Sequence, residues 1–357
     1  YLAAIGSRLR FPFSGVPNQH TYPRGCTFTE SDWDALCPFW YPVAFSHDVS
    51  DRPVTATLLD QRLVIWRTSV GISVANDICL HRGIPLSMGW VAGDSLVCKY
   101  HGFHYSAQGQ CIKVPANPEA SIPKKLCLKT YPAIEAYGLV WTTLSGNNQN
   151  TLPDFHEWED PDYQQILPNA VDIDAASGRQ IEGFLDVAHF AWVHTDTFGD
   201  INNPVVPRYE VVTTEHGLRA EYLSNVSNFP KALQDQAPAD FQWLRVFEVN
   251  LPFTARLTVH FPGEGRLCIM NAASPVSARK TRIFVPICRN FDKDQPLEPV
   301  YEFNYQVFAE DQEVVESQYP EDLPLDMAAE SHIGADKTSI AYRRGLRSLG
   351  LGAIYTA

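Results

Sequence analysis

The chain has 357 residues, enough for about two domains, and 45% of them are hydrophobic, as in a globular protein with a large core. Its net charge of -13 argues against nucleic acid as the main partner, because contact with phosphates needs a basic surface. No apolar run approaches the roughly eighteen residues of a membrane helix, and the first residues lack the pattern of a signal peptide. The eight cysteines show no compact disulfide spacing, so we expect free thiols and a cytoplasmic location without membrane contact.

The first half of the chain has the pattern of an all-β domain. Residues 1–32 are proline-rich and irregular, and we expect an N-terminal arm there. Residues 33–150 contain short runs rich in Val, Ile, Tyr and Trp between Asp, Gly and Pro, which is typical of antiparallel strands. The runs are 39–45, 54–59, 62–66, 71–76, 95–100 and 139–143. The glycine and asparagines of 145–153 indicate a linker to the next domain.

The second expected domain, residues 151–357, mixes helical and strand patterns. Helices are predicted at 177–194, 299–318 and 337–349. Strands are predicted at 208–222 and 242–261, and 266–289 is predicted to form two strands divided near Pro275. An antiparallel sheet flanked by helices on one side would give the whole chain an α+β fold, with the all-β domain first.

Two short segments carry the strongest chemical pattern in the sequence. A C-x-H pair and a C-x-x-H pair are separated by sixteen residues, and their members are Cys79, His81, Cys98 and His101. Two thiolates and two imidazoles can hold either a zinc ion or a Rieske 2Fe-2S cluster, in which one iron takes both cysteines and the other both histidines. Zinc sites that mix these residues usually pair like with like, so the mixed pairs favour the cluster. Gly83 and Gly102 suit tightly bent ligand loops.

A second group of candidate ligands lies in the predicted helix 177–194. Asp186 and His189 are three residues apart and would share a helical face. His194 follows His189 by five residues, which on a regular helix separates the two by about 140°. If both bind one metal ion, the helix must end or distort between them. Two histidines and one carboxylate on one side of a metal are the ligands of iron(II) oxygenases.

Together, these motifs resemble the two metal sites of Rieske non-heme iron oxygenases. The resemblance covers roughly residues 33–350 and is greatest to the group with one kind of oxygenase subunit, which includes dicamba, vanillate and methylxanthine demethylases. It implies one Rieske 2Fe-2S cluster and one mononuclear Fe(II) per subunit. It also implies that His189 and His194 bind the iron, and that Asp186 bridges to a Rieske histidine of a neighbouring subunit.

The third iron ligand is implied by a pattern near the end of the chain. The F-x-E-D-x-x-V-x-E-S-Q sequence of 308–318 resembles the C-terminal helix of this group, in which the carboxylate ligand corresponds to Asp311. Three neighbouring acids are expected to be exposed or structural: Glu310, Glu313 and Glu316. Asn304 lies seven residues before Asp311 on the same helical face, so it would either hydrogen-bond the substrate or support the site indirectly.

The resemblance implies an oxygenase that uses O2 to hydroxylate or oxidatively demethylate a small aromatic or heterocyclic compound. Because no G-x-G-x-x-G nucleotide motif follows a strand, electrons would come from a separate NAD(P)H-dependent flavin reductase, with or without a ferredoxin. A head-to-tail homotrimer is implied as well. The alternatives are a ring dioxygenase that forms cis-dihydrodiols and a Rieske electron carrier, although a carrier would not need the second site.

Three positions depart from the usual family pattern. Lys99 stands where proline is common and Phe103 where tryptophan is common, and we expect the charge of Lys99 to raise the reduction potential of the cluster. Gly183 stands where the family commonly has asparagine, three residues before Asp186. The smaller residue would leave room for water or for a bulkier substrate.

Overall fold

The computed structural model describes residues 22–146, 150–230, 233 and 236–352. The first part of this chain forms three antiparallel sheets, with strand orders β2-β3-β4-β9, β5-β6-β7-β8 and β1-β11-β10. The strands are β1 (Tyr41–Phe45), β2 (Val54–Leu58), β3 (Gln61–Thr68), β4 (Gly71–Asn76), β5 (Trp90–Ala92), β6 (Ser95–Val97), β7 (His104–Tyr105), β8 (Cys111–Lys113), β9 (Thr130–Tyr131), β10 (Ala133–Ala136) and β11 (Leu139–Thr142). The predicted all-β domain is therefore confirmed.

Two details of this part differ from the sequence-based expectation. The predicted strand 95–100 ends at Val97, because the next residues form a tight loop instead. A helix not expected from the sequence, α1 (Glu30–Leu36), begins before residue 33, and the Thr29 hydroxyl caps it by accepting from the Asp32 amide at 3.2 Å. Most of the predicted arm, residues 1–21, and the centre of the predicted linker lie outside the described residues.

The second part contains a nine-stranded antiparallel sheet. Its order is β12-β20-β18-β17-β16-β15-β14, and β19 joins β13 to β18. The strands are β12 (Gln164–Ile166), β13 (Val171–Ile173), β14 (Glu210–Thr213), β15 (Gly217–Ser224), β16 (Trp243–Asn250), β17 (Thr254–His260), β18 (Arg266–Ser277), β19 (Lys280–Phe284) and β20 (Ile287–Arg289). The first division in 266–289 follows Ser277, because β18 continues through Pro275 with a shift in register, and the segment forms three strands where two were predicted.

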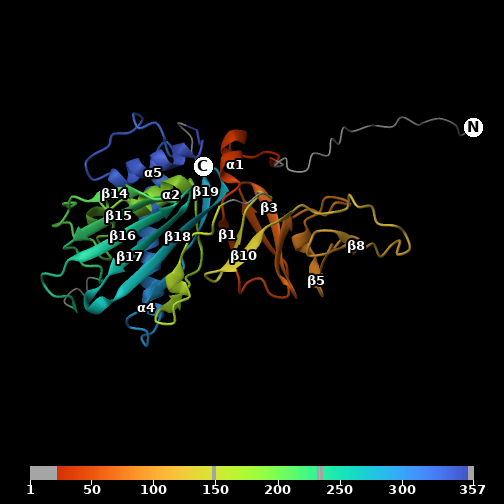
Figure 1. Ribbon diagram of the computed structural model, residues 1–357, viewed down its shortest axis with the longest axis horizontal. Helices are drawn as coiled ribbons and strands as arrows, with labels where there is room; N and C mark the ends of the chain where they lie inside the picture. Colours follow the sequence, from red (N-terminus) through yellow and green to blue (C-terminus); the bar gives the residue numbers. More distant parts are fainter. Residues whose placement is uncertain (1–21, 147–149, 231–232, 234–235, 353–357) are drawn as a thin grey trace, which may run out of the picture.

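Helices of the second part cover one face of this sheet, as Figure 1 shows. The helices are α2 (Ser177–Leu185), α3 (Phe190–Val193), α4 (Glu298–Ser317) and α5 (Lys337–Ser348), and short 3-10 turns lie at η1 (Leu86–Met88), η2 (His156–Trp158) and η4 (Pro262–Glu264). Helix α2 packs on β17 and β18 and contacts both α4 and α5, while α5 packs on β14 and β15. The α+β class predicted from the sequence is confirmed. No helix in the described ranges is long and apolar enough to cross a membrane.

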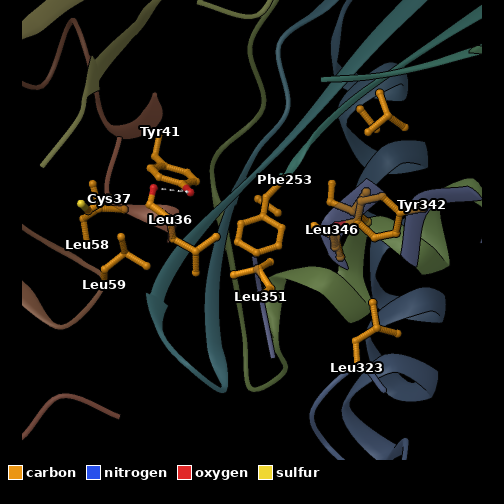
Figure 2. Packing of buried hydrophobic residues seen from close by; sticks show 14 of the residues in the cluster. Leu36, Cys37, Tyr41, Leu58, Leu59, Phe253, Leu323, Tyr342, Leu346 and Leu351 are labelled. Atoms are coloured by element: carbon orange, nitrogen blue, oxygen red, sulfur yellow. Dashed lines mark hydrogen bonds between the residues drawn. The ribbon is translucent and has the colours of Figure 1, made fainter. Parts of the chain in front are cut away.

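One hydrophobic core joins the two parts of the chain (Figure 2). Tyr41 and Leu36 from the first part pack in the same cluster as Phe253, Tyr342 and Leu351 from the second part. The backbone connects the parts as well, since the amides at 59 and 60 donate to carbonyls of β18 at 2.7 and 2.9 Å. The β-domain is therefore attached to the large sheet by both packing and hydrogen bonds.

A buried ion network holds α5 against α2, the helix that ends just before Asp186. The Arg343 guanidinium donates to both carboxylate oxygens of Glu182, at 2.6 and 2.7 Å, and also contacts Glu330. Arg343→Met would leave Glu182 buried without this partner, so we expect it to lower the free energy of unfolding by about 3–5 kcal/mol. Thermal unfolding of the variant measures the loss. Arg347→Met, on the exposed side of the same helix, is the control and should stay within about 0.5 kcal/mol of the wild type.

Candidate metal centres and active site

Two loops of the first domain have the same backbone construction. They are residues 79–84, between β4 and β5, and residues 98–103, between β6 and β7. In each loop the amide of the first residue donates to the carbonyl of the sixth, at 2.8 and 2.9 Å, and the amide of the fifth donates to the carbonyl of the first, at 2.8 and 2.9 Å. The fifth residues are Gly83 and Gly102, with φ of +74° and +66°. Glycine suits both positions because this left-handed conformation is costly for other residues.

The side chains of these loops bring thiols and imidazoles together. Cys79 and Cys98 are buried, and the Cys79 sulfur lies 3.4 Å from the Tyr105 hydroxyl. The Nδ1 atoms of His81 and His101 face each other at 3.1 Å, with His101 exposed at the surface. Two buried sulfur atoms beneath two facing imidazoles fit a 2Fe-2S cluster with a cysteine side and a histidine side. The role of the four residues as cluster ligands stays a prediction.

The two departures in the second loop have different surroundings. Phe103 is buried and stacks on His81, with ring centroids 4.6 Å apart and an angle of 4° between the planes, so it fixes the orientation of this imidazole. Lys99 is exposed. His104, which lies outside the four-residue motif, is hydrogen-bonded to Ser95 at 2.9 Å.

The predicted helix 177–194 is broken at the second group of ligands. Helix α2 ends at Leu185, and Asp186 has extended backbone angles, with φ of -74° and ψ of 130°. Its Oδ1 accepts from the Ala188 amide at 2.8 Å, a local hydrogen bond of the kind that competes with helix continuation. The chain resumes helical structure only in α3. A continuous helix is therefore wrong here, and the break is the one required if both histidines bind one metal ion.

The break brings the predicted ligands together with a residue of α4. His189 Nε2 and His194 Nε2 lie 3.1 Å apart, and Asp311 Oδ1 lies 3.4 and 3.2 Å from them. Within the part of the chain that the structure describes, these three residues are the one group of three or more His, Cys, Asp and Glu whose ligand atoms lie close enough together to share a single metal ion. Two imidazoles and a carboxylate are the donor set of mononuclear iron(II) sites.

Each histidine is oriented by a further carboxylate. His189 Nδ1 lies 3.3 Å from Asp186 Oδ2, and His194 Nδ1 lies 2.7 Å from Glu310 Oε2, which also accepts from the Thr197 hydroxyl at 2.8 Å. Protons on both Nδ1 atoms would leave both Nε2 atoms as acceptors for a metal. The orienting contact of Glu310 was missed by sequence analysis, because the spacing within α4 does not indicate a partner in another segment.

The charged groups of this site shift one another's pKa. Burial alone would lower the pKa of His189, but hydrogen bonds with Asp186 and Asp311 raise it to about 9. Burial favours the neutral acid at Asp311, yet hydrogen bonds from His189 and His194 hold its pKa below the usual value, and His189 lowers the pKa of Asp186 in the same way. Both carboxylates are therefore ionised at neutral pH, as binding of a cation requires.

A cavity of about 610 Å³ opens beside the site, between α4, α2 and the sheet. Asn304 lines it, and its amide nitrogen donates to the Val300 carbonyl of its own helix at 2.7 Å. Gly183 also lines it, and a Cβ at this position would lie 3.3 Å from a methyl group of Val315, so glycine allows α2 to approach α4 closely. A groove of about 840 Å³ between α5 and the β14–β15 hairpin contains none of the predicted site residues.

Glu310 offers a direct test of how His194 is held. Glu310→Ala would leave a buried imidazole without its acceptor, and we expect iron affinity at the second site to fall about 10- to 100-fold. Glu310→Gln retains an oxygen acceptor and should recover part of this loss. Iron content after dialysis against a graded series of chelator concentrations measures the effect. Glu313→Ala, on the exposed side of the same helix, should behave as the wild type, and equal iron retention in all variants would contradict the assignment.

Comparisons with known proteins identify the family of this chain. Residues 39–132 match the Rieske [2Fe-2S] domain, and residues 173–351 match the Vanillate O-demethylase oxygenase C-terminal domain. Methylxanthine N1-demethylase NdmA of Pseudomonas putida is 33% identical over 322 residues, covering 87% of this chain and 88% of the relative. The toluene-4-sulfonate monooxygenase iron-sulfur subunit TsaM1 of Comamonas testosteroni is 28% identical, covering 82% and 92%.

Solved structures agree as well. The structure of Pseudomonas putida NdmA with caffeine superimposes with a TM-score of 0.80 at 31% identity, covering 89% of this chain and 92% of that one. The family models account for both metal centres in one chain. The protein therefore belongs to the Rieske non-heme iron oxygenases of the vanillate O-demethylase type, which are oxidoreductases with a 2Fe-2S cluster and a mononuclear iron.

Proposed function

We propose that this chain is the oxygenase component of a system that hydroxylates a C–H bond of a small aromatic or heterocyclic compound, in particular that of an N- or O-methyl group. The observation that carries the proposal is the group of His189, His194 and Asp311 at the wall of an apolar cavity. Three protein ligands on one side leave positions for O2 and substrate on the other. Phe184, Phe190 and other aromatic side chains of the cavity suit a flat ring.

Each residue has a distinct task in this proposal. Cys79 and Cys98 hold one iron of the cluster, and His81 and His101 hold the other. His189, His194 and Asp311 hold the mononuclear iron, and when bound the two groups supply electron storage and the chemistry of dioxygen. The side-chain oxygen of Asn304 accepts a hydrogen bond from substrate, since the amide nitrogen already donates within α4.

The overall reaction balances with electrons from outside the chain. Demethylation converts the substrate, O2, two electrons and two protons into the demethylated product, formaldehyde and water. A separate NAD(P)H-dependent flavin reductase, directly or through a ferredoxin, would supply the electrons. The names of the relatives, which are demethylases and monooxygenases, favour this reaction over formation of a cis-dihydrodiol.

The arrangement of the two centres supports assembly of several copies. The sheet β5-β6-β7-β8 with its two loops lies at one end of the molecule, away from the large sheet (Figure 1). Electron transfer over a short distance would then need the cluster loops of a neighbouring copy. The side chain of Asp186 is 33% exposed, so a histidine of such a loop could contact it. We propose a homotrimer with head-to-tail contacts, in which Asp186 joins a Rieske histidine of the next subunit to His189.

The first test is the content of iron and acid-labile sulfide per chain in anaerobically purified protein, with an EPR spectrum after reduction. The proposal requires three irons, two sulfides and a Rieske-type signal, and then release of formaldehyde from methylated heterocycles or methoxy-aromatics with NADH and a flavin reductase. A cis-dihydrodiol product would instead identify a ring dioxygenase. Two irons and no turnover would favour an electron carrier, and zinc without sulfide would overturn the proposal.

A further inference from the structure

An arginine without a carboxylate partner lies in the wall of the substrate cavity. Arg245 is on β16, between Tyr222 of β15 and Val259 of β17 in the register of the sheet. It lines the cavity of the proposed iron site and is only 1% exposed. Its guanidinium carbon lies 5.5 Å from the centre of the Phe190 ring, which is itself edge-on to His189 at 4.9 Å. One aromatic ring therefore separates the guanidinium from an expected iron ligand.

The hydrogen bonds of this guanidinium are incomplete. Arg245 Nε donates to Asn228 Oδ1 and Nη2 donates to the Val226 carbonyl, both at 3.2 Å, so one short segment holds one edge of the group. Nη1 has no hydrogen-bond partner, and neither has the amide nitrogen of Asn228, which also lines the cavity. No carboxylate in the described ranges lies within the 4.0 Å of an ion pair from its nitrogens.

The missing counter-ion is costly. Burial lowers the pKa of Arg245 to about 10, which still leaves the guanidinium charged at neutral pH. A buried charge without a partner is strongly destabilising. The faces of Tyr222 and Phe190 offset only part of this cost, because a cation–π contact is weaker than the hydration that the charge has lost.

Two other buried arginines of the described chain have carboxylate partners. Arg343 is paired with Glu182, and Arg179 with Glu330 at 2.8 Å. Arg289 lines the same cavity as Arg245, but it donates to the Gln164 side chain at 2.8 Å and to the Asp292 carbonyl at 2.7 Å. Arg245 combines a place in the cavity wall with an unpaired nitrogen, as a residue that binds an anionic ligand would.

We infer that Arg245 and the Asn228 amide bind the carboxylate or sulfonate group of an aromatic substrate. The inference rests on the proposed function, since it concerns the substrate of that site. The planar guanidinium matches the oxygens of such an anion. The two unpaired donors are covered in the ligand-free structure, and they become satisfied when their side chains turn toward the ligand. His189 and Asp311 line the same cavity as Arg245, so a ligand held by the guanidinium lies in the cavity of the proposed iron site.

The test compares ligands that differ in charge but scarcely in shape. The probes are 4-methoxybenzoate with 4-methoxybenzamide, and toluene-4-sulfonate with toluene-4-sulfonamide, each titrated calorimetrically into anaerobic holoenzyme. We expect at least one anion to bind about 30-fold or more tightly than its neutral partner. Equal affinities within both pairs would overturn the inference.

Variants assign the preference to one side chain. Arg245→Met should abolish it, and Arg245→Lys should retain part of it, because lysine keeps the charge without the planar fork. Arg245→Met should also unfold at a temperature no lower than that of the ligand-free wild type, since it removes an uncompensated buried charge. Arg289→Gln is the matched control from the same cavity. A preference that survives in Arg245→Met and disappears in Arg289→Gln would contradict the assignment.

A second variant and a binding readout distinguish failure of this inference from failure of the proposed reaction. If Arg245→Met fails to fold, Asn228→Ala removes one of the two donors, and its loss of anion preference supports the inference while an unchanged preference opposes it. Binding does not require turnover, so the test is separate from that of the reaction. Formaldehyde release from neutral substrates without any anion preference would sink the inference alone, whereas Arg245-dependent anion binding in a protein with no oxygenase activity would sink the proposed reaction alone.

Discussion

Replacement of Asp311 by alanine should reduce the iron content from three to two per chain while both sulfides of the cluster remain. Asp311 supplies the oxygen that lies 3.2 and 3.4 Å from the two histidine Nε2 atoms, and α4 is the element that brings it to the site. Without it the site has two neutral donors, too few to retain iron(II) against dialysis. Turnover should fall by a factor of about 1,000 or more, because the chemistry depends on the lost metal.

The measurement for Asp311→Ala is metal analysis together with acid-labile sulfide and the EPR signal of the reduced cluster. An unchanged signal shows that the first domain is intact, so any loss of iron belongs to the second site. Glu302→Ala, an exposed acid on the same helix, controls for general effects on α4. Retention of three irons and full activity in Asp311→Ala would show that another residue completes the iron site.

Replacement of Asp186 by alanine should separate metal content from activity. Asp186 contacts His189 through Nδ1 at 3.3 Å, on the side of the imidazole away from the three-residue metal group. With iron(II) in excess, both centres should therefore remain loaded, while the rate of turnover falls about 100-fold or more through loss of the bridge and of the fixed imidazole. The expected signature is a cluster that reduces normally but is reoxidised slowly in the presence of substrate and O2.

The test of Asp186→Ala combines metal analysis with stopped-flow absorbance of the cluster under single-turnover conditions. Asp196→Ala is the control, because Asp196 lies close by in sequence and is exposed. Rapid reoxidation at the wild-type rate would remove Asp186 from the electron path. Loss of the mononuclear iron instead would mean that Asp186 helps to bind the metal.

The features predictable from sequence were those with a local signal. Short apolar runs identified the strands of the first domain, and the glycines at 83 and 102 marked loops whose backbone requires them. The five-residue spacing of His189 and His194 also predicted that a regular helix could not present both to one metal. These inferences depend only on residues that are close together in the sequence.

The features that were missed depend on distant partners. Glu310 orients His194 across a separation of 116 residues, and nothing in the pattern of α4 distinguishes its carboxylate from that of Glu313. Arg245 has an ordinary place in a strand pattern, and only the sheet and the helices above it show that the guanidinium is buried. The position of the helix break at Asp186 was also beyond the sequence, because it depends on a side-chain hydrogen bond to the Ala188 amide.

Helix α4 combines two properties that are rarely found together in one element. It supplies Asp311, yet among its twenty residues only Val315 is fully buried, because much of its inner face borders the cavity rather than the core. Exchanges at cavity-lining positions such as Phe303 and Val307 would therefore reshape the cavity at little cost to folding. Changes in the cavity-lining residues of α4 can therefore alter which molecules the cavity accepts, while the metal ligands and the sheet stay unchanged.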